Sequence, residues 1–128
     1  MTSVKPLAHG YICMELPDEV EIESMRKDIA LYCTLHSYRS GSVFIDRDVP
    51  DDVYSRTRFF DLLHEVRETQ AHAVVVPTAG HLSSDASVRN ALERMIEHVN
   101  AKVFVVYETN GGGPPVEGGR DVDLAPGA

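Results

Sequence analysis

The residues best able to do chemistry follow three short apolar runs. Glu15 ends the run AHGYICME (8–15), Asp46-Arg47-Asp48 follows SVFI (42–45), and TAGHLSSD (78–85) follows AHAVVVP (71–77). Such runs are typical of buried parallel strands, whose carboxyl ends meet at one edge of a sheet, where ligands bind. We therefore expect a possible ligand rim at this edge, formed by Glu15, Asp46, Arg47, Arg56, His81 and Ser83.

This rim could bind a divalent cation, because carboxylates such as Glu15, Asp46 and Asp48 are ligands that Mg²⁺ and Ca²⁺ prefer. Their spacing matches no dedicated metal-binding loop. The alternative, which we favour, is that Glu15 pairs with Arg47 or Arg56 or caps a helix N-terminus. The scattered histidines and two cysteines also lack zinc-site spacing, so we expect neither metal nor cofactor.

His81 could act as a general base beside Ser83 or Ser84. No G-x-S-x-G turn precedes these serines, and the sequence favours an exposed loop histidine. The loop 78–84 could instead bind a small anion through backbone N–H groups at the next helix N-terminus. That possibility is generic to the architecture.

Helical periodicity predicts three helices between the strands. The first helix opens at Pro17-Asp18, and its inward residues are expected to be Ile22, Met25, Ile29, Tyr32/Cys33 and His36. The second runs from Thr57 to about Gln70 and is expected to bury Phe59, Phe60, Leu63 and Val66. The third covers about 86–99, and its apolar side is formed by Val88, Ala91, Leu92, Met95, Ile96 and Val99. KVFVVY (102–107) is the fourth strand. The alternating order predicts a mostly parallel, doubly wound α/β sheet with helices on both faces.

Composition narrows the class of protein. The chain has 128 residues, 43% of them hydrophobic, and a net charge of −8. The excess of acids and the lack of a Lys/Arg cluster disfavour autonomous DNA binding, which depends on neutralising phosphates. No apolar run is long enough for a membrane span or a signal peptide, which favours a cytoplasmic location. We expect one domain over 1–109 and a disordered Gly/Pro-rich tail over 110–128.

Several segments together resemble the catalytic domain of the serine recombinases, the resolvase/invertase family. These segments are GYICME, VFIDR, RTRFFDLL (56–63) and HAVVVPTAGHLSSD (72–85), and the resemblance covers about residues 8–107. It implies a three-layer resolvase-like fold and an activity in site-specific DNA recombination. In that family a serine on the first strand attacks the DNA phosphate, and arginines hold the phosphate.

The resemblance departs from the family at most catalytic positions. Tyr11, Asp46 and Arg56 match the family motifs. The other positions differ: Cys13 replaces an arginine, Glu15 the nucleophilic serine, Gly80-His81 an aspartate-arginine pair, and Ser84 the last arginine. Strand cleavage needs an activated hydroxyl and several cations around the phosphate. The resemblance therefore implies a catalytically inactive relative.

Two classes of function follow. The first, which we favour, is a non-catalytic regulatory or interaction module that binds a protein partner or itself; it predicts an exposed apolar patch on a helix face. The second is a small-molecule or phosphoryl-ligand site, which predicts a pocket where Glu15, Asp46, Arg56 and His81 converge. The family's long dimerisation helix and helix-turn-helix module have no counterpart in residues 110–128, which disfavours a third option, a recombinase accessory subunit. The acidic loop DRDVPDDVYS (46–55) is expected to be a solvated loop rather than a docking surface.

Overall fold

Four parallel strands form the central sheet of the computed structural model, which describes residues 4–107. The sheet order is β2-β1-β3-β4. Its strands are β1 (Leu7–Met14), β2 (Arg39–Arg47), β3 (Ala73–Val76) and β4 (Lys102–Val105), and they alternate with α1 (Glu19–Leu35), α2 (Thr57–Thr69), a 3₁₀ turn η1 (Ala79–His81) and α3 (Ala86–His98). The parallel α/β fold expected from the sequence is confirmed.

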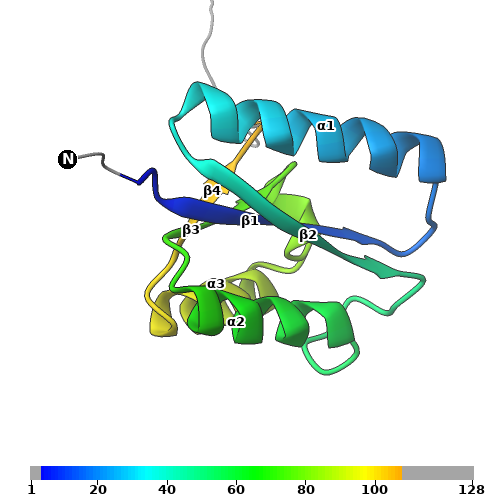
Figure 1. The fold of residues 1–128 in the computed structure, drawn as a ribbon. Helices are drawn as coiled ribbons and strands as arrows, with labels where there is room; N and C mark the ends of the chain where they lie inside the picture. The colour runs from blue at the N-terminus through cyan, green and yellow to red at the C-terminus, as the bar shows by residue number, and fades with distance from the viewer. Residues whose placement is uncertain (1–3, 108–128) are drawn as a thin grey trace, which may run out of the picture.

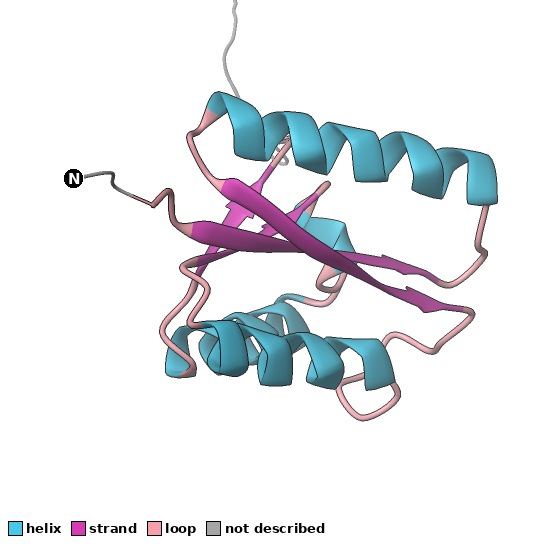
Figure 2. Cartoon of the chain, viewed as in Figure 1, coloured by secondary structure: helices cyan, strands magenta, loops and turns pink. Residues whose placement is uncertain are grey.

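The helices form one layer on each side of the sheet. Helix α1 covers one face, and α2 and α3 lie together on the other (Figure 1). Figure 2 shows the same three layers by type of secondary structure. Because chain order and sheet order diverge at β1, the crevice between the carboxyl ends of β1 and β3 is the topological switch point where such folds place their ligands.

Side chains that alternate along each strand divide the core into two halves. On β3, Val74 and Val76 pack toward α2 and α3, whereas Ala73 and Val75 pack toward α1. All four are fully buried. This explains why β3 reads as an unbroken apolar run: both of its faces are covered.

Local sequence explains the start and the packing of α1. The Asp18 side chain accepts hydrogen bonds from the backbone N–H groups of Val20 and Glu21, so it caps the helix. A Cβ on Gly10 would lie 3.0 Å from the Ile29 side chain. Glycine at this position thus allows α1 to lie close against β1.

Three details of the predicted core differ in the structure. His36 is exposed, because α1 ends at Leu35 and His36 is its C-cap. Phe60 is 39% exposed. Leu62, which the sequence analysis did not select, is fully buried and takes a central place between α2 and the sheet.

Two expectations from the sequence concern the C-terminal tail and membrane-spanning segments. The Gly/Pro-rich segment 110–128 lies beyond them. Within residues 4–107, no helix combines the length and apolar character that crossing a bilayer requires.

Candidate functional site

Arg56 is the centre of a buried polar cluster at the carboxyl ends of the strands. Its residue exposure is 1%, yet each of its three guanidinium nitrogens donates a hydrogen bond. Nε donates to the Asp52 carbonyl at 3.2 Å, and Nη1 donates to the Tyr11 hydroxyl at 3.3 Å and the His81 carbonyl at 3.1 Å. Nη2 forms a 2.7 Å ion pair with Asp51. Every nitrogen of the guanidinium is therefore engaged within the protein.

Asp46, at the end of β2, supplies the cap that α2 lacks in its own sequence. The N-cap residue Arg56 makes no side-chain cap bond. Instead, the buried Asp46 carboxylate accepts the backbone N–H groups of Arg58 at 3.0 Å and Phe59 at 3.1 Å. It also accepts the Tyr11 hydroxyl at 2.7 Å. The positive end of the helix dipole favours a carboxylate at this place.

Asp51 closes the cluster from the acidic loop. One carboxylate oxygen accepts Arg56 and the Ser83 hydroxyl at 2.9 Å; the other accepts the Ser84 hydroxyl at 3.0 Å and the Ser84 backbone N–H at 3.3 Å. The Asp51 side chain is 37% exposed. Loop 46–55 is mostly exposed, as expected of a solvated loop, but Asp51 ties it to the strand ends.

The cluster fixes the protonation of its members. Burial alone would raise the pKa of Asp51, but hydrogen bonds from Ser83, Ser84 and Arg56 outweigh it and hold that pKa below the ordinary value of 3.8. Burial raises the pKa of the Tyr11 phenol far above its usual range. At neutral pH the cluster therefore contains a neutral phenol and an ionised Arg56–Asp51 pair.

His81 lies beside the cluster as a neutral acceptor. Its Nδ1 accepts the backbone N–H of Cys13 at 3.1 Å. Burial, with a smaller contribution from the Arg56 charge, lowers the pKa of His81 below 6.5. Burial also raises the pKa of the Cys13 thiol, which disfavours the reactive thiolate. His81 is half-buried rather than the exposed loop histidine that the sequence favoured.

Two residues of the predicted rim do not join the cluster. Glu15 is exposed, and none of the ion pairs within residues 4–107 includes it. The predicted pairing of Glu15 with Arg47 or Arg56 is therefore wrong. Arg47 instead makes a two-pronged ion pair with Glu19, at 2.7 and 2.9 Å, because β2 brings it beside the start of α1. Within the same range, no cluster of three or more potential ligands has metal-binding geometry.

The structure shows roles for two carboxylates that the sequence did not predict. Asp51 was grouped with a solvated loop, although it forms the only ion pair of Arg56 within residues 4–107. Asp46 was selected as a rim residue, but its role as a cap for α2 was not recognised. Because Ser55 and Thr57 flank the N-cap residue Arg56, the sequence carries no clear signal that the cap of α2 comes from another strand.

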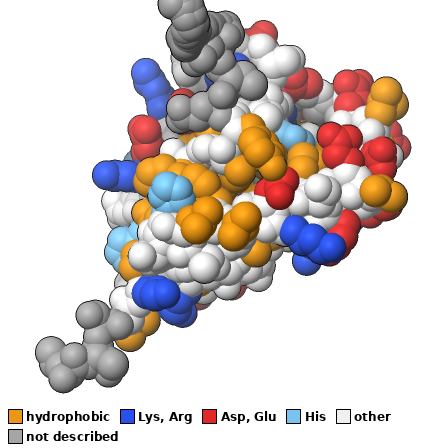
Figure 3. All heavy atoms as spheres, turned by 90° about the horizontal axis from the view of Figure 1, so that it is seen from above, with side chains coloured by type: hydrophobic (Ala, Val, Ile, Leu, Met, Phe, Trp, Pro, Cys, Tyr) orange, Lys and Arg blue, Asp and Glu red, His pale blue; other side chains and the backbone are white. Residues whose placement is uncertain are grey.

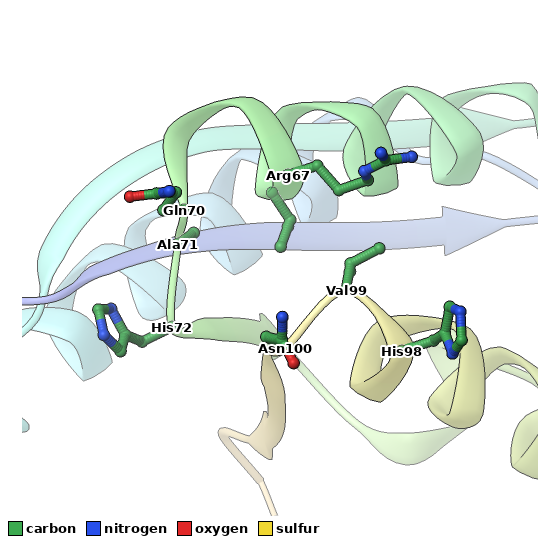
Figure 4. Close-up of a pocket in the computed structure, with 8 residues that line it drawn as sticks. Arg67, Gln70, Ala71, His72, His98, Val99 and Asn100 are labelled. Atoms are coloured by element: carbon green, nitrogen blue, oxygen red, sulfur yellow. The ribbon is translucent and has the colours of Figure 1, made fainter.

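A separate cleft lies at the opposite edge of the sheet, where α2 and α3 end. Its volume is about 630 Å³, and it is lined by Val66, Arg67, Gln70, Ala71, His72, His98, Val99 and Asn100. Figure 4 shows Arg67 and His98 extending to one side, and Gln70 and His72 to the other. Because these polar groups do not converge on a common point, the cleft offers less chemistry than the Arg56 cluster.

Comparison with solved structures identifies the class of fold. The C-terminal catalytic domain of ISC1926 TnpA, an IS607-like serine recombinase, matches with a TM-score of 0.68 at 18% identity over 80% of this chain and 71% of that one. The N-terminal catalytic domain of TP901-1 integrase matches with a TM-score of 0.68 at 12% identity over 77% and 76%.

A resolvase family site-specific recombinase from Streptococcus pneumoniae matches with a TM-score of 0.66 at 11% identity, over 80% of this chain and 72% of that one. No protein-family model and no curated protein sequence matches the chain. At these identities the likeness establishes the fold. The chain therefore has the α/β fold of serine recombinase catalytic domains.

Proposed function

We propose that this domain has the serine recombinase fold without its strand-cleavage chemistry, and that it acts by binding a protein surface. The state of Arg56 is the observation that supports this proposal. This residue matches a phosphate-binding arginine of the family, but it is 1% exposed and all its nitrogens donate within the protein. A DNA phosphate would have to displace the Asp51 carboxylate to reach it.

The residues around Arg56 support the same proposal. Transfer of a phosphodiester needs a hydroxyl nucleophile and cations that stabilise the developing charge. Glu15, at the nucleophile position, presents an exposed carboxylate that would repel a phosphate. The hydroxyls of Ser83 and Ser84 donate to Asp51, so neither is free to act in place of the missing serine.

A phosphoryl-ligand site is the second candidate, and one observation favours it. Asp51 is bound by a guanidinium, two hydroxyls and one backbone N–H, a set of donors that also suits a phosphate. Such a ligand would replace Asp51 as the acceptor. The predicted convergence of Glu15 with Asp46, Arg56 and His81 does not support this candidate, because Glu15 is not part of the cluster.

The test measures binding to a short labelled DNA duplex at low and moderate salt, and nicking of supercoiled plasmid. We expect no cleavage, no covalent protein–DNA product, and no binding with the steep salt dependence of phosphate contacts. Cleavage that is lost in Arg56→Lys but retained in the matched control Arg58→Lys would overturn the proposal. Saturable binding of inorganic phosphate by the original chain, strengthened in Asp51→Asn, would support the second candidate.

A further inference from the structure

The outer surface of α1 carries exposed hydrophobic side chains near both of its ends. Near the start, Leu16 and Val20 are 85% and 82% exposed; near the end, Leu31 and Leu35 are 57% and 70% exposed. They are four of the eight large hydrophobic residues exposed within residues 4–107. Figure 3, which looks down on this side of the molecule, shows hydrophobic and acidic side chains close together there. Exposed hydrophobic side chains that gather on one face of a protein are a feature of interaction surfaces.

Helix geometry places three of these side chains on one stripe. Successive residues of an α-helix are rotated by about 100°, so Val20, Leu31 and Leu35 fall within a sector of about 60°. This sector lies opposite the buried face of α1, which is formed by Ile22, Met25, Ile29 and Cys33. Ser24 and Lys27 occupy the middle of the stripe. The stripe is therefore apolar at both ends and polar in the centre.

The same helix carries both a groove and side chains able to fill it. A shallow groove on the first half of the surface is lined by Glu19, Val20, Glu23, Ser24 and Lys27. The exposed side chains of Leu31 and Leu35 lie on the second half. A surface with both features is self-complementary, as an isologous two-fold interface requires, because each feature then meets the other across the symmetry axis.

We propose that this surface of α1 binds the same surface of a second copy of the chain, with the two helices antiparallel. This inference deepens the proposed function by naming its partner. With the two-fold axis between Met25 and Arg26, Leu31 of one copy faces Val20 of the other. Leu35 of one copy then lies at the level of Leu16 of the other, which just precedes the start of α1.

Charge distribution supports a second copy in the antiparallel direction. Four acids, Asp18, Glu19, Glu21 and Glu23, lie at the start of α1, and no basic residue lies in its last turn. A parallel pair would bring the two acidic ends together, whereas an antiparallel pair separates them and also opposes the helix dipoles favourably.

A two-fold axis in the interface keeps each flank of the helix on its own side. Lys27 therefore approaches Glu23 of the second copy, since both residues lie on the same flank. No ion pair within residues 4–107 includes Lys27, and Glu23 makes only an exposed 3.7 Å contact with Arg26. Two symmetric Lys27–Glu23 pairs would fix the register of the interface.

The first test is the mass of the full chain in solution, by size-exclusion chromatography with light scattering over a concentration series. We expect a dimer that the double variant Leu31→Glu/Leu35→Glu weakens at least tenfold. Tyr54→Glu is the matched control, because Tyr54 is 88% exposed but lies outside α1, and we expect it to remain a dimer. Circular dichroism should show that both variants are folded.

The second test is a charge exchange. Lys27→Glu and Glu23→Lys should each weaken the dimer, and the double variant should recover it, because the pair is restored in reverse. A chain that stays monomeric at roughly 0.1 mM, about a hundredfold above a micromolar dissociation constant, would overturn the interface. So would a dimer that the leucine variant leaves intact. Neither result would affect the non-catalytic part of the proposed function, which DNA cleavage would overturn.

Discussion

The cluster around Arg56 and the outer surface of α1 differ in how completely their groups are satisfied. In the cluster, a buried guanidinium, two carboxylates and a phenol bond to one another and to the start of α2. On α1, Val20, Leu31 and Leu35 are left in solvent. The difference teaches that polar groups bond to one another at the edge where folds of this kind place their ligands, while hydrophobic side chains remain exposed on α1.

The closed state of the cluster has an energetic reason. An unpaired polar group inside a protein costs about 1–3 kcal/mol, so a buried arginine requires acceptors for all of its nitrogens. Asp51, Asp52, Tyr11 and His81 supply them. An external phosphate would compete with these internal acceptors and would also meet the negative charges of Asp51 and Glu15.

The largest expected effect is the loss of the Asp46 carboxylate. Asp46→Ala leaves the Tyr11 hydroxyl and two N–H groups of α2 without their acceptor, so it combines the loss of a cap with buried unsatisfied donors. We expect the free energy of unfolding to fall by about 3 kcal/mol, measured by urea denaturation. Asp46→Asn, which retains one acceptor oxygen, should lose less. Equal losses in the two variants would contradict the role assigned to the carboxylate.

A smaller effect is expected at Asp51. Asp51→Asn removes the charge that compensates Arg56, but the side chain is 37% exposed, and solvent screening limits the loss to about 1 kcal/mol. The pKa of Asp51 in the folded state lies below the ordinary 3.8. Its ionised form therefore stabilises the fold above that pH, and the stabilisation is lost as the pH falls below it.

Stability curves at pH 5 and pH 3 check this linkage. The difference between the original chain and Asp51→Asn should be largest at pH 5 and smaller at pH 3. A difference that grows toward pH 3 would show that the carboxylate is not held in its ionised form by the cluster.

His81 predicts a pH dependence at higher pH. Because burial lowers its pKa below 6.5 in the folded state, the unfolded chain binds more protons there, and the free energy of unfolding should decrease as the pH falls from 7 toward 5. His9, also buried with a lowered pKa, adds to the decrease. His81→Asn should reduce the slope and leave the part due to His9. An unchanged slope would mean that His81 titrates freely.

The smallest effect is expected at Glu15. An exposed side chain with no ion pair among residues 4–107 contributes little to folding, so Glu15→Gln should change the free energy of unfolding by less than about 0.5 kcal/mol. Thermal denaturation of the two proteins measures the difference. A loss of about 3 kcal/mol would instead indicate a buried ion pair.

Most of the fold was predictable because it depends on local patterns. The periodicity of α1 identified Ile22, Met25, Ile29 and Cys33 as its buried face, and the apolar run of β3 identified a strand covered on both sides. One error arose where an element ends, at His36. Others arose in α2, where neighbouring apolar residues compete for the buried face: Phe60 is exposed beside the buried Phe59, and Leu62 is buried. Burial at such positions depends on helix orientation, which the sequence pattern determines only coarsely.

The candidate site was predictable only in part, because its contacts join residues far apart in the chain. Parallel topology correctly placed Asp46, Arg56, His81 and Ser83 at one edge of the sheet. The partner of each was not predictable, since Asp51 reaches Ser83 across 32 positions and Arg47 pairs with Glu19 across 28. Loop conformation decides these pairs, and several acids in the same segment compete for each arginine.

The most direct test of the central claim follows the Arg56 Nε–Hε resonance by NMR during titration with inorganic phosphate and then with a short DNA duplex. If the cluster is closed by Asp51, this resonance stays in place in the original chain while exposed arginines such as Arg58 respond weakly and without saturation. A saturable shift of the Arg56 signal in the original chain would show that a phosphate reaches the guanidinium. That result would contradict a closed, non-catalytic site.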